Sequence, residues 1–185
     1  KMNLLFPEHH LSHAASTFYP SPYEEAAIIT VDGVGEWATA SFCHGKGKDI
    51  EILYELQFPH SVGLLYSAFT YFLGFKVNSG EYKLMGLAPY GNVDGEDMKR
   101  HVEQIKSELI TIHEDGSLWM NQKYFNYSTG LTMVKEKKWE ELFGMAIRDP
   151  ESEMEQCHCD LGLAIQLVTE EILIAMAKHL KKLTG

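Results

Sequence analysis

Three histidines fall within five positions near the start of the chain, in the stretch EHHLSHAAS. If this stretch is helical, His9 and His13 lie on one face with Cβ atoms about 5–6 Å apart. His10 points about 100° away from that pair, because of the helical period. Two neutral imidazoles this close can bind one divalent metal, and a carboxylate would complete a mixed site suited to iron, manganese or zinc rather than calcium. Asp32, at the end of a predicted buried strand, is the best-placed carboxylate in the sequence.

The spacing of the histidines leaves a simpler interpretation open. A chain with nine histidines will sometimes cluster them at a helix end or on a solvated face. The stretch does not match the zinc-protease motif, because that motif has Glu directly after its first His as the general base, whereas His10 stands there in this sequence. Metal binding is therefore a prediction, and metalloprotease chemistry lacks its catalytic residue.

The stretch DGVGE, residues 32–36, is predicted to form a tight turn after a strand. Glycines expose backbone N–H groups and allow a ligand to approach closely, which suits phosphate oxygens. The alternative is a hairpin turn that needs positive φ at its glycines. Taken alone, the pattern favours the hairpin turn.

The elements that position these residues follow from hydrophobic periodicity. A helix over EHHLSHAASTFYPS is ended by Pro20 and Pro22. Three strands then form an antiparallel meander, at residues 25–35, 37–47 and 50–58, with a hairpin turn at 45–48. Downstream we expect helices at 63–75, 97–112, 137–145 and 151–183, a loop around a short helical turn at 78–92, and a small hairpin at 113–125 that turns at Asp115-Gly116.

Composition bounds the class of protein. The chain has 185 residues and is 45 % hydrophobic, which suits one globular domain or one lobe. Its formal net charge of −10 argues against nucleic-acid binding. Three cysteines argue against a disulfide framework and for a reducing, cytoplasmic compartment. No apolar run is long enough to span a membrane, and no signal peptide is visible. The chain opens on Lys1 and closes on LTG after a helix, so we expect a piece of a longer protein.

The two motifs are followed in order by PHSVGLLYSAFTYFLGF and SGEYKLMGLAPYG. Together they resemble the O-carbamoyltransferase family of the nodulation-protein and antibiotic-tailoring type. The resemblance implies an α/β fold, part of a lobe of the actin, Hsp70 and sugar-kinase (ribonuclease H-like) type, with an antiparallel meander packed against helices. Residues 1–185 would then be a single fragment of the domain that uses ATP and carbamoyl phosphate, cut at both ends.

The resemblance also implies a reaction and a ligand set. Such enzymes form a carbamoyl-adenylate and pyrophosphate from carbamoyl phosphate and ATP, then pass the carbamoyl group to a hydroxyl. By position, His9, His13 and Asp32 would bind a divalent metal, with iron expected first and manganese or magnesium as alternatives, and a further aspartate ligand would lie beyond Gly185. The residues expected to contact the nucleotide or substrate are His10, Asp32, Gly33 and Gly35.

Two further residues are candidates for catalysis. Lys83, in SGEYKLMG, can meet a phosphate as a point charge, and His60, in FPHSVG, lies where a strand meets a helix that Ser61 can cap. A solvated loop for Lys83 and a capping-region position for His60 are the simpler interpretations. The three tryptophans are expected to be core residues or hairpin anchors rather than stacking platforms.

Other functions stay open at this point. One alternative is a relative that modifies tRNA or matures hydrogenases, which shares HHLSHAAS but not GEYKLMGLAPYG. A second is a non-catalytic interaction lobe, which would keep only the fold. A third is a two-histidine iron oxygenase, which would need a barrel of strands. For the carbamoyltransferase interpretation, we expect small-molecule substrates and no nucleic-acid or membrane partner. The missing parts of its own chain would complete the site, a second copy of the chain is a candidate partner, and the fragment alone would be inactive.

Overall fold

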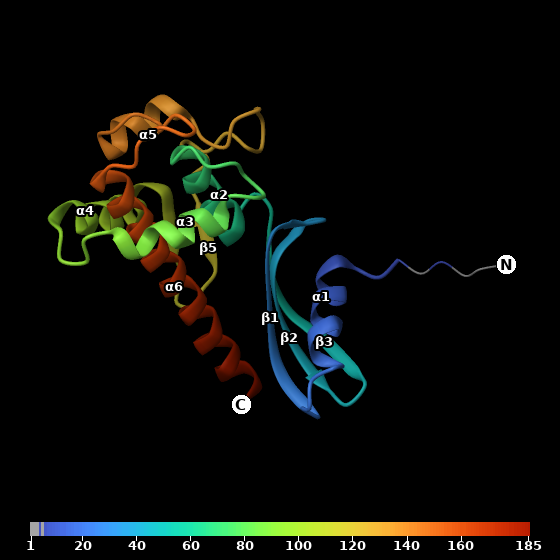
Figure 1. The fold of residues 1–185 in the computed structure, drawn as a ribbon. Helices are drawn as coiled ribbons and strands as arrows, with labels where there is room; N and C mark the ends of the chain where they lie inside the picture. Colours follow the sequence, from blue (N-terminus) through green and yellow to red (C-terminus); the bar gives the residue numbers. More distant parts are fainter. Residues whose placement is uncertain (1–3, 5) are drawn as a thin grey trace.

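The computed structural model describes Leu4 and residues 6–185 (Figure 1). Its sheet contains β1 (Glu25–Gly35), β2 (Ala38–Lys46) and β3 (Asp49–Gln57), antiparallel in the order β1-β2-β3. The predicted meander is therefore confirmed. The turn between β2 and β3 is also where the sequence indicates it, since Lys46 pairs with Asp49 and Gly47 takes a left-handed φ of 60°.

The β1–β2 turn lies later in the chain than predicted. Gly35 pairs with Ala38, so Glu36 and Trp37 form the turn, and Glu36 adopts the left-handed φ of 62°. Asp32 instead lies in a bulged segment of β1, where the register shifts between Val31 and Gly35. Neither Gly33 nor Gly35 has positive φ, so the conformational reason given for these glycines is wrong.

One helix covers one face of the sheet, and the helical body covers the other (Figure 1). Helix α1 (His9–Phe18) packs its residues Ala14 and Phe18 on Ile28 and Cys43, which form a small apolar cluster. On the opposite face, Ala40 and Phe42 of β2 join a much larger core shared with α2 (Val62–Phe72) and α6 (Gln156–Thr184). Helices α1 and α2 match predicted helices within a few residues at their ends, and α6 matches the last predicted helix except at its start.

The remaining elements complete the helical body. They are α3 (Glu81–Leu87), a 3₁₀ turn (Ala88–Tyr90), α4 (Glu96–Gln104), a π turn (Ile105–Leu109), β4 (Ile110–Ile112), β5 (Leu118–Met120) and α5 (Glu136–Phe143). An aromatic cluster lies at the centre, where the ring of Phe69 is 4.7 Å from Trp139 and 5.7 Å from Phe143 between centroids. No described helix is both long and apolar enough to cross a membrane.

Several predicted boundaries are wrong for local physical reasons. The helix predicted at 97–112 ends in the π turn, because the β-branched run ITI pairs as β4 with β5 across the predicted Asp115-Gly116 turn. The short helical turn predicted within the loop at 78–92 is present as the seven-residue helix α3. Helix α6 begins five residues after Glu151, where Glu155 and His158 form a reciprocal capping box.

The tryptophans were predicted to be core residues or hairpin anchors, and two of the three lie in hairpins, Trp37 at the β1–β2 turn and Trp119 in β5. Trp139 is fully buried, as expected, but Trp119 is 46 % exposed and Trp37 is 72 % exposed. Trp37 stands in the two-residue turn at the tip of the β1–β2 hairpin, between Gly35 and Ala38.

Candidate metal centre

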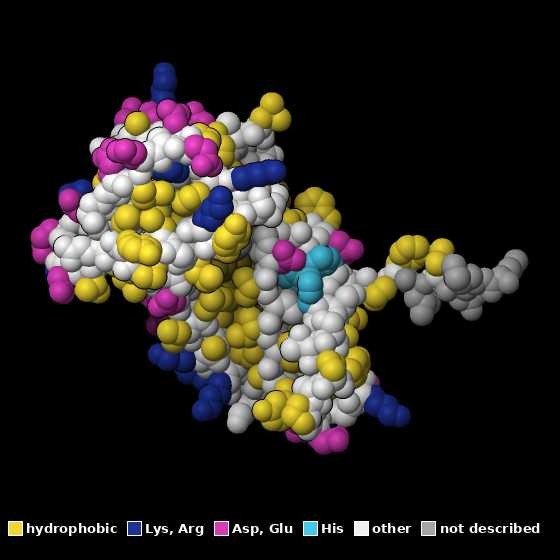
Figure 2. Space-filling model, viewed as in Figure 1, with side chains coloured by type: hydrophobic (Ala, Val, Ile, Leu, Met, Phe, Trp, Pro, Cys, Tyr) yellow, Lys and Arg dark blue, Asp and Glu magenta, His cyan; other side chains and the backbone are white. Residues whose placement is uncertain are grey.

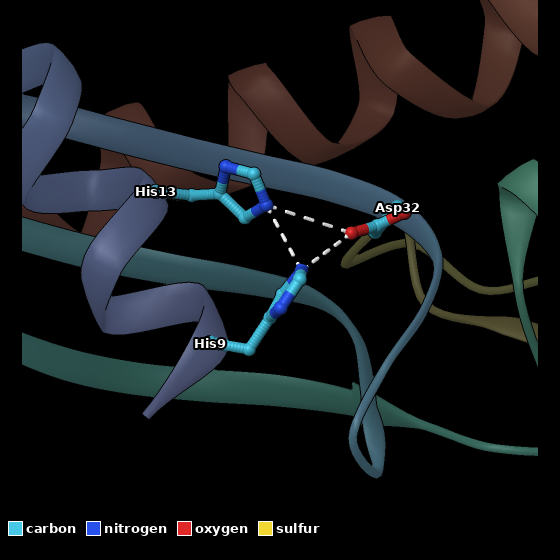
Figure 3. Close-up of side chains that lie close together, drawn as sticks. All are labelled: His9, His13 and Asp32. Carbon is cyan, nitrogen blue, oxygen red and sulfur yellow. Dashed lines mark hydrogen bonds and ion pairs between the residues drawn. The ribbon is translucent and has the colours of Figure 1, made fainter. Parts of the chain in front are cut away.

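Three predicted ligands meet where α1 crosses the bulged end of β1 (Figure 3). The Nε2 atom of His9 lies 2.8 Å from Oδ2 of Asp32 and 2.9 Å from Nε2 of His13. The Nε2 atom of His13 lies 3.6 Å from the same carboxylate oxygen. The helical spacing thus places both imidazoles on one face, as predicted, and the strand brings the carboxylate to them.

The fold fixes the Asp32 carboxylate through its own backbone. The N–H of Gly33 donates to Oδ1 of Asp32 at 2.7 Å, which leaves Oδ2 facing the histidines. Ser61 caps α2 by accepting from the N–H of Leu64, and its hydroxyl lies 2.7 Å from the Gly33 carbonyl oxygen and 3.2 Å from that of Asp32. Gly63 allows the close approach, since a Cβ there would stand 2.5 Å from the Asp32 carbonyl oxygen. The first turn of α2 therefore holds the bulge that presents Asp32.

The arrangement fits a divalent cation. Ligand atoms each about 2.1 Å from a common centre are separated by roughly 3–3.5 Å, which the three measured separations of 2.8–3.6 Å bracket. Two imidazole nitrogens and one carboxylate oxygen form a donor set typical of iron, manganese or zinc. The side chains of His9, His13 and Asp32 are 40, 54 and 35 % exposed, so the ligands are open to an ion from solvent.

Electrostatics keep the carboxylate ionised. Burial acts to raise the pKa of Asp32, but the hydrogen bonds from His9 and the Gly33 N–H and the nearby charges of His9 and His13 outweigh it, so the pKa is lowered. An ionised Asp32 is the form that binds a metal. As metal ligands, His9 and His13 would bind through uncharged nitrogens and would add no negative charge to a chain whose net charge is −10.

His10 points into the protein rather than toward the other two histidines. It is 2 % exposed, and its Nδ1 lies 3.0 Å from Oγ1 of Thr30 and 3.1 Å from Oγ of Ser41. Those two hydroxyls are themselves 2.5 Å apart. Burial, and then the neighbouring His9, lower the pKa of His10. Because Nδ1 is already hydrogen-bonded to Thr30 and Ser41, only Nε2 is left for the nucleotide contact that the sequence predicts for His10.

The two glycines of the motif have different surroundings. A Cβ on Gly35 would collide with the rings of His9 and His10, so this glycine lets the hairpin pack against the histidine helix. A Cβ on Gly33 would meet nothing within 4 Å. The Gly33 N–H, expected to face a phosphate, donates to Asp32 instead. Contact of either glycine with a nucleotide stays a prediction.

The two candidate catalytic residues lie apart from the histidine cluster. The Nδ1 atom of His60 accepts from the N–H of Met120 at 3.0 Å, and burial lowers the pKa of His60. Lys83 is exposed on α3 and lines a hollow of about 760 Å³ together with Lys76 and Arg148. No described side-chain hydrogen bond or ion pair joins His60 or Lys83 to the cluster, so their catalytic roles stay predictions.

Sequence reasoning missed the hydroxyl pair beneath His10. Thr30 and Ser41 pair across β1 and β2, and both are buried under α1. A signal was present, because strand alternation puts Thr30 on the same face as Ile28, and a polar residue in a buried strand needs a partner. The partner proves to be the histidine that does not point at the metal centre.

Comparison with known proteins covers nearly all of the chain. Residues 1–184 match the family described as Carbamoyltransferase N-terminus. An uncharacterized protein of Synechocystis, sll1178, is 53 % identical over 173 residues, which are 94 % of this chain and 27 % of the relative. The nodulation protein NolNO of Sinorhizobium fredii is 29 % identical over 180 residues, covering 97 % of this chain and 24 % of that protein. The nodulation protein NolO of Bradyrhizobium diazoefficiens is 27 % identical over 179 residues, covering 96 % and 29 %. The chain therefore spans about a quarter of the length of these relatives.

Proposed function

This chain belongs to the carbamoyltransferase N-terminal domain family, and from that premise we propose that it supplies a metal centre for ATP-dependent O-carbamoyl transfer. In the proposed reaction, water cleaves carbamoyl phosphate to carbamate and inorganic phosphate, and a carbamate oxygen displaces pyrophosphate from ATP to give a carbamoyl-adenylate. The carbamoyl group then passes to an acceptor hydroxyl and AMP leaves. The observation that carries the proposal is the convergence of His9, His13 and Asp32 within ligand distance of one another.

The three side chains suit a reaction between anions. In a chain with net charge −10, ATP and carbamoyl phosphate would be repelled unless positive charge were supplied locally. A bound divalent metal, iron first and manganese or magnesium next, would supply that charge and polarise a phosphoryl or carbamoyl oxygen. His9 and His13 would hold it without adding negative charge, and Asp32 would add one.

The buried parts of the site keep the ligands in place. Ser61 and Gly63 fix the Asp32 backbone from α2, and His10 fixes α1 on the sheet through Thr30 and Ser41. Catalysis of phosphoryl and adenylyl transfer depends mainly on such positioning and on charge stabilisation. We propose that the meander and its helices form part of an actin-like lobe, which the rest of a longer chain would complete.

The test is transfer of radiolabelled carbamoyl phosphate, with ATP, to a panel of small-molecule hydroxyl acceptors by the full protein that the gene encodes. We expect a labelled product together with AMP and pyrophosphate, and at least a 100-fold lower rate for H13A and D32N. The matched control is H113A, because His113 is exposed and lies outside the cluster. If D32N and H13A transferred label as fast as wild type, the cluster would have no part in the reaction. We also expect residues 1–185 alone to be inactive.

A further inference from the structure

A small acidic hollow adjoins the metal centre at the tip of the β1–β2 hairpin. Its volume is about 190 Å³, and its lining includes Glu8, His9, His10, Glu36, Trp37 and Glu55. Resting on the proposed function, we propose that this hollow binds an ammonium group of the acceptor, so that the substrate is a hydroxylated amine. His9 belongs both to the hollow and to the metal centre, which joins the two.

The charge of the hollow selects for a cation. Glu8, Glu36 and Glu55 contribute three carboxylates to its wall, and all three residues are exposed. None of them forms an ion pair with a Lys, Arg or His side chain in the described part of the chain. A ligand carboxylate or phosphate would be repelled there, whereas an ammonium group would be attracted.

Trp37 supplies the aromatic surface that such a cation prefers. Its side chain lines the hollow and is 72 % exposed. A ligand ammonium over a tryptophan ring is attracted by the ring quadrupole, and tryptophan is the strongest of the aromatic residues in this interaction. The residue is thus a stacking surface at the hairpin tip, not an anchor in a core.

His10, whose ring carries a buried nitrogen without a partner, lines the hollow beside Gly35. His10 is 2 % exposed, and its Nδ1 is occupied by the Thr30 and Ser41 hydroxyls. Its Nε2 has no hydrogen-bond partner among the described residues, and this edge of the ring faces Gly35, which also lines the hollow. A buried imidazole nitrogen without a partner is costly, so a hydrogen bond to a ligand group here would be favoured. When Nδ1 carries the proton, Nε2 accepts from an ammonium N–H.

The size of the hollow limits what it can hold. Sites that enclose a whole drug-sized ligand have volumes of about 300–1,000 Å³. At about 190 Å³ this hollow accommodates a head group rather than a complete substrate. The rest of the acceptor, with its reacting hydroxyl, would extend past His9 toward Asp32. Figure 2 shows that acidic and hydrophobic side chains border the histidine patch on this face.

The test compares two probes that differ only in charge. Saturation-transfer NMR titrations of the full protein with trans-4-aminocyclohexanol and with cyclohexane-1,4-diol give the two Kd values. We expect the amine to bind at least about tenfold more tightly than the diol. The double variant E36Q/E55Q should lose that preference, and W37L should reduce it severalfold. The matched control is E51Q. Glu51 is exposed on β3, the strand that carries Glu55, but it lies outside the hollow, so this variant should leave both Kd values unchanged.

Measuring the metal content of wild type and E36Q/E55Q distinguishes failure of the ammonium site from failure of the proposed metal centre. Equal Kd values for the two probes, or an unchanged amine preference in E36Q/E55Q, would overturn the ammonium site even if wild type bound its metal normally. Absence of metal in wild type would overturn the metal centre, but it would leave the probe comparison as an independent result. Metal retained by E36Q/E55Q also shows that the variant is folded.

Discussion

The two faces of the three-stranded sheet differ in size and polarity. Under α1, a few apolar side chains surround a buried polar network of His10, Thr30 and Ser41, and the ligand cluster lies at the end of that face. Under α2 and α6, the buried apolar residues form one large core. The hydrophobic effect scales with apolar area removed from water, so the second face supplies most of the stability. The face under α1 can therefore carry buried polar and metal-ligating side chains.

The largest expected effect comes from breaking the apolar face. Phe69 is fully buried against Trp139 and Phe143, so F69A should lower the free energy of unfolding by about 3–5 kcal/mol. Urea unfolding measures this loss. F6A is the control, because Phe6 is 89 % exposed and its loss should cost under about 0.5 kcal/mol. Similar losses in the two variants would show that the helical body is not the stabilising face.

The next effect distinguishes the two glycines of the bulge. G35A places a methyl group against the His9 and His10 rings, so it should cost about 1–3 kcal/mol and weaken metal binding. G33A has open space and should stay within about 0.5 kcal/mol of wild type. Thermal unfolding and metal titration of both proteins provide the comparison. A tolerated G35A with normal metal affinity would contradict the packing of the hairpin on α1.

Ser61 joins the two faces, because it caps α2 on one side and holds the backbone of Asp32 on the other. S61A removes the cap and the bond to the Gly33 carbonyl, so we expect a loss of about 1–2 kcal/mol together with weaker metal binding. S12A is the matched control, since the Ser12 hydroxyl bonds only within the exposed side of α1. A stability loss without any change in metal affinity would separate Ser61 from the site.

The smallest effect concerns pH and the buried histidine of the helical body. Burial lowers the pKa of His101, although its hydrogen bond with Gln104 acts in the opposite direction. Below about pH 6.5 the unfolded chain binds a proton that the folded chain does not, so the free energy of unfolding falls as the pH falls through this range toward the folded-state pKa.

Unfolding of wild type should therefore need less urea at pH 5 than at pH 7, and H101N should show a smaller difference between the two. The exposed-site variant H113N should keep the wild-type difference. An identical pH dependence in H101N and wild type would mean that His101 titrates alike in both states.

Periodicity was sufficient for the parts of the fold whose contacts are local. The α1 helix and the β1-β2-β3 meander follow from spacing, and so does the His9–His13 pair, because residues four apart share a helical face. The turn was misplaced because Asp-Gly-x-Gly resembles a turn, whereas long-range contacts from Ser61 and Gly63 hold it as a bulge. Such contacts leave no periodic signal in the sequence.

The acidic hollow was not predictable for a similar reason. Glu8, Glu36 and Glu55 come from three separate elements, and only the fold brings them to one wall. The exposure of Trp37 depends on a turn two residues long, which hydrophobic patterning cannot place to the residue. Likewise, the sequence predicts a helix over the ITI segment because its partner strand, β5, lies across a loop.

The most direct test of the central claim is the metal stoichiometry of the dialysed protein by elemental analysis, for wild type, H9A, H13A and H113A. The geometry of His9, His13 and Asp32 predicts about one divalent metal per chain in wild type and H113A. H9A and H13A should lose metal affinity by more than the roughly 10–100-fold that loss of an outer-shell partner costs. Equal metal content in all four proteins would show that these imidazoles are not ligands.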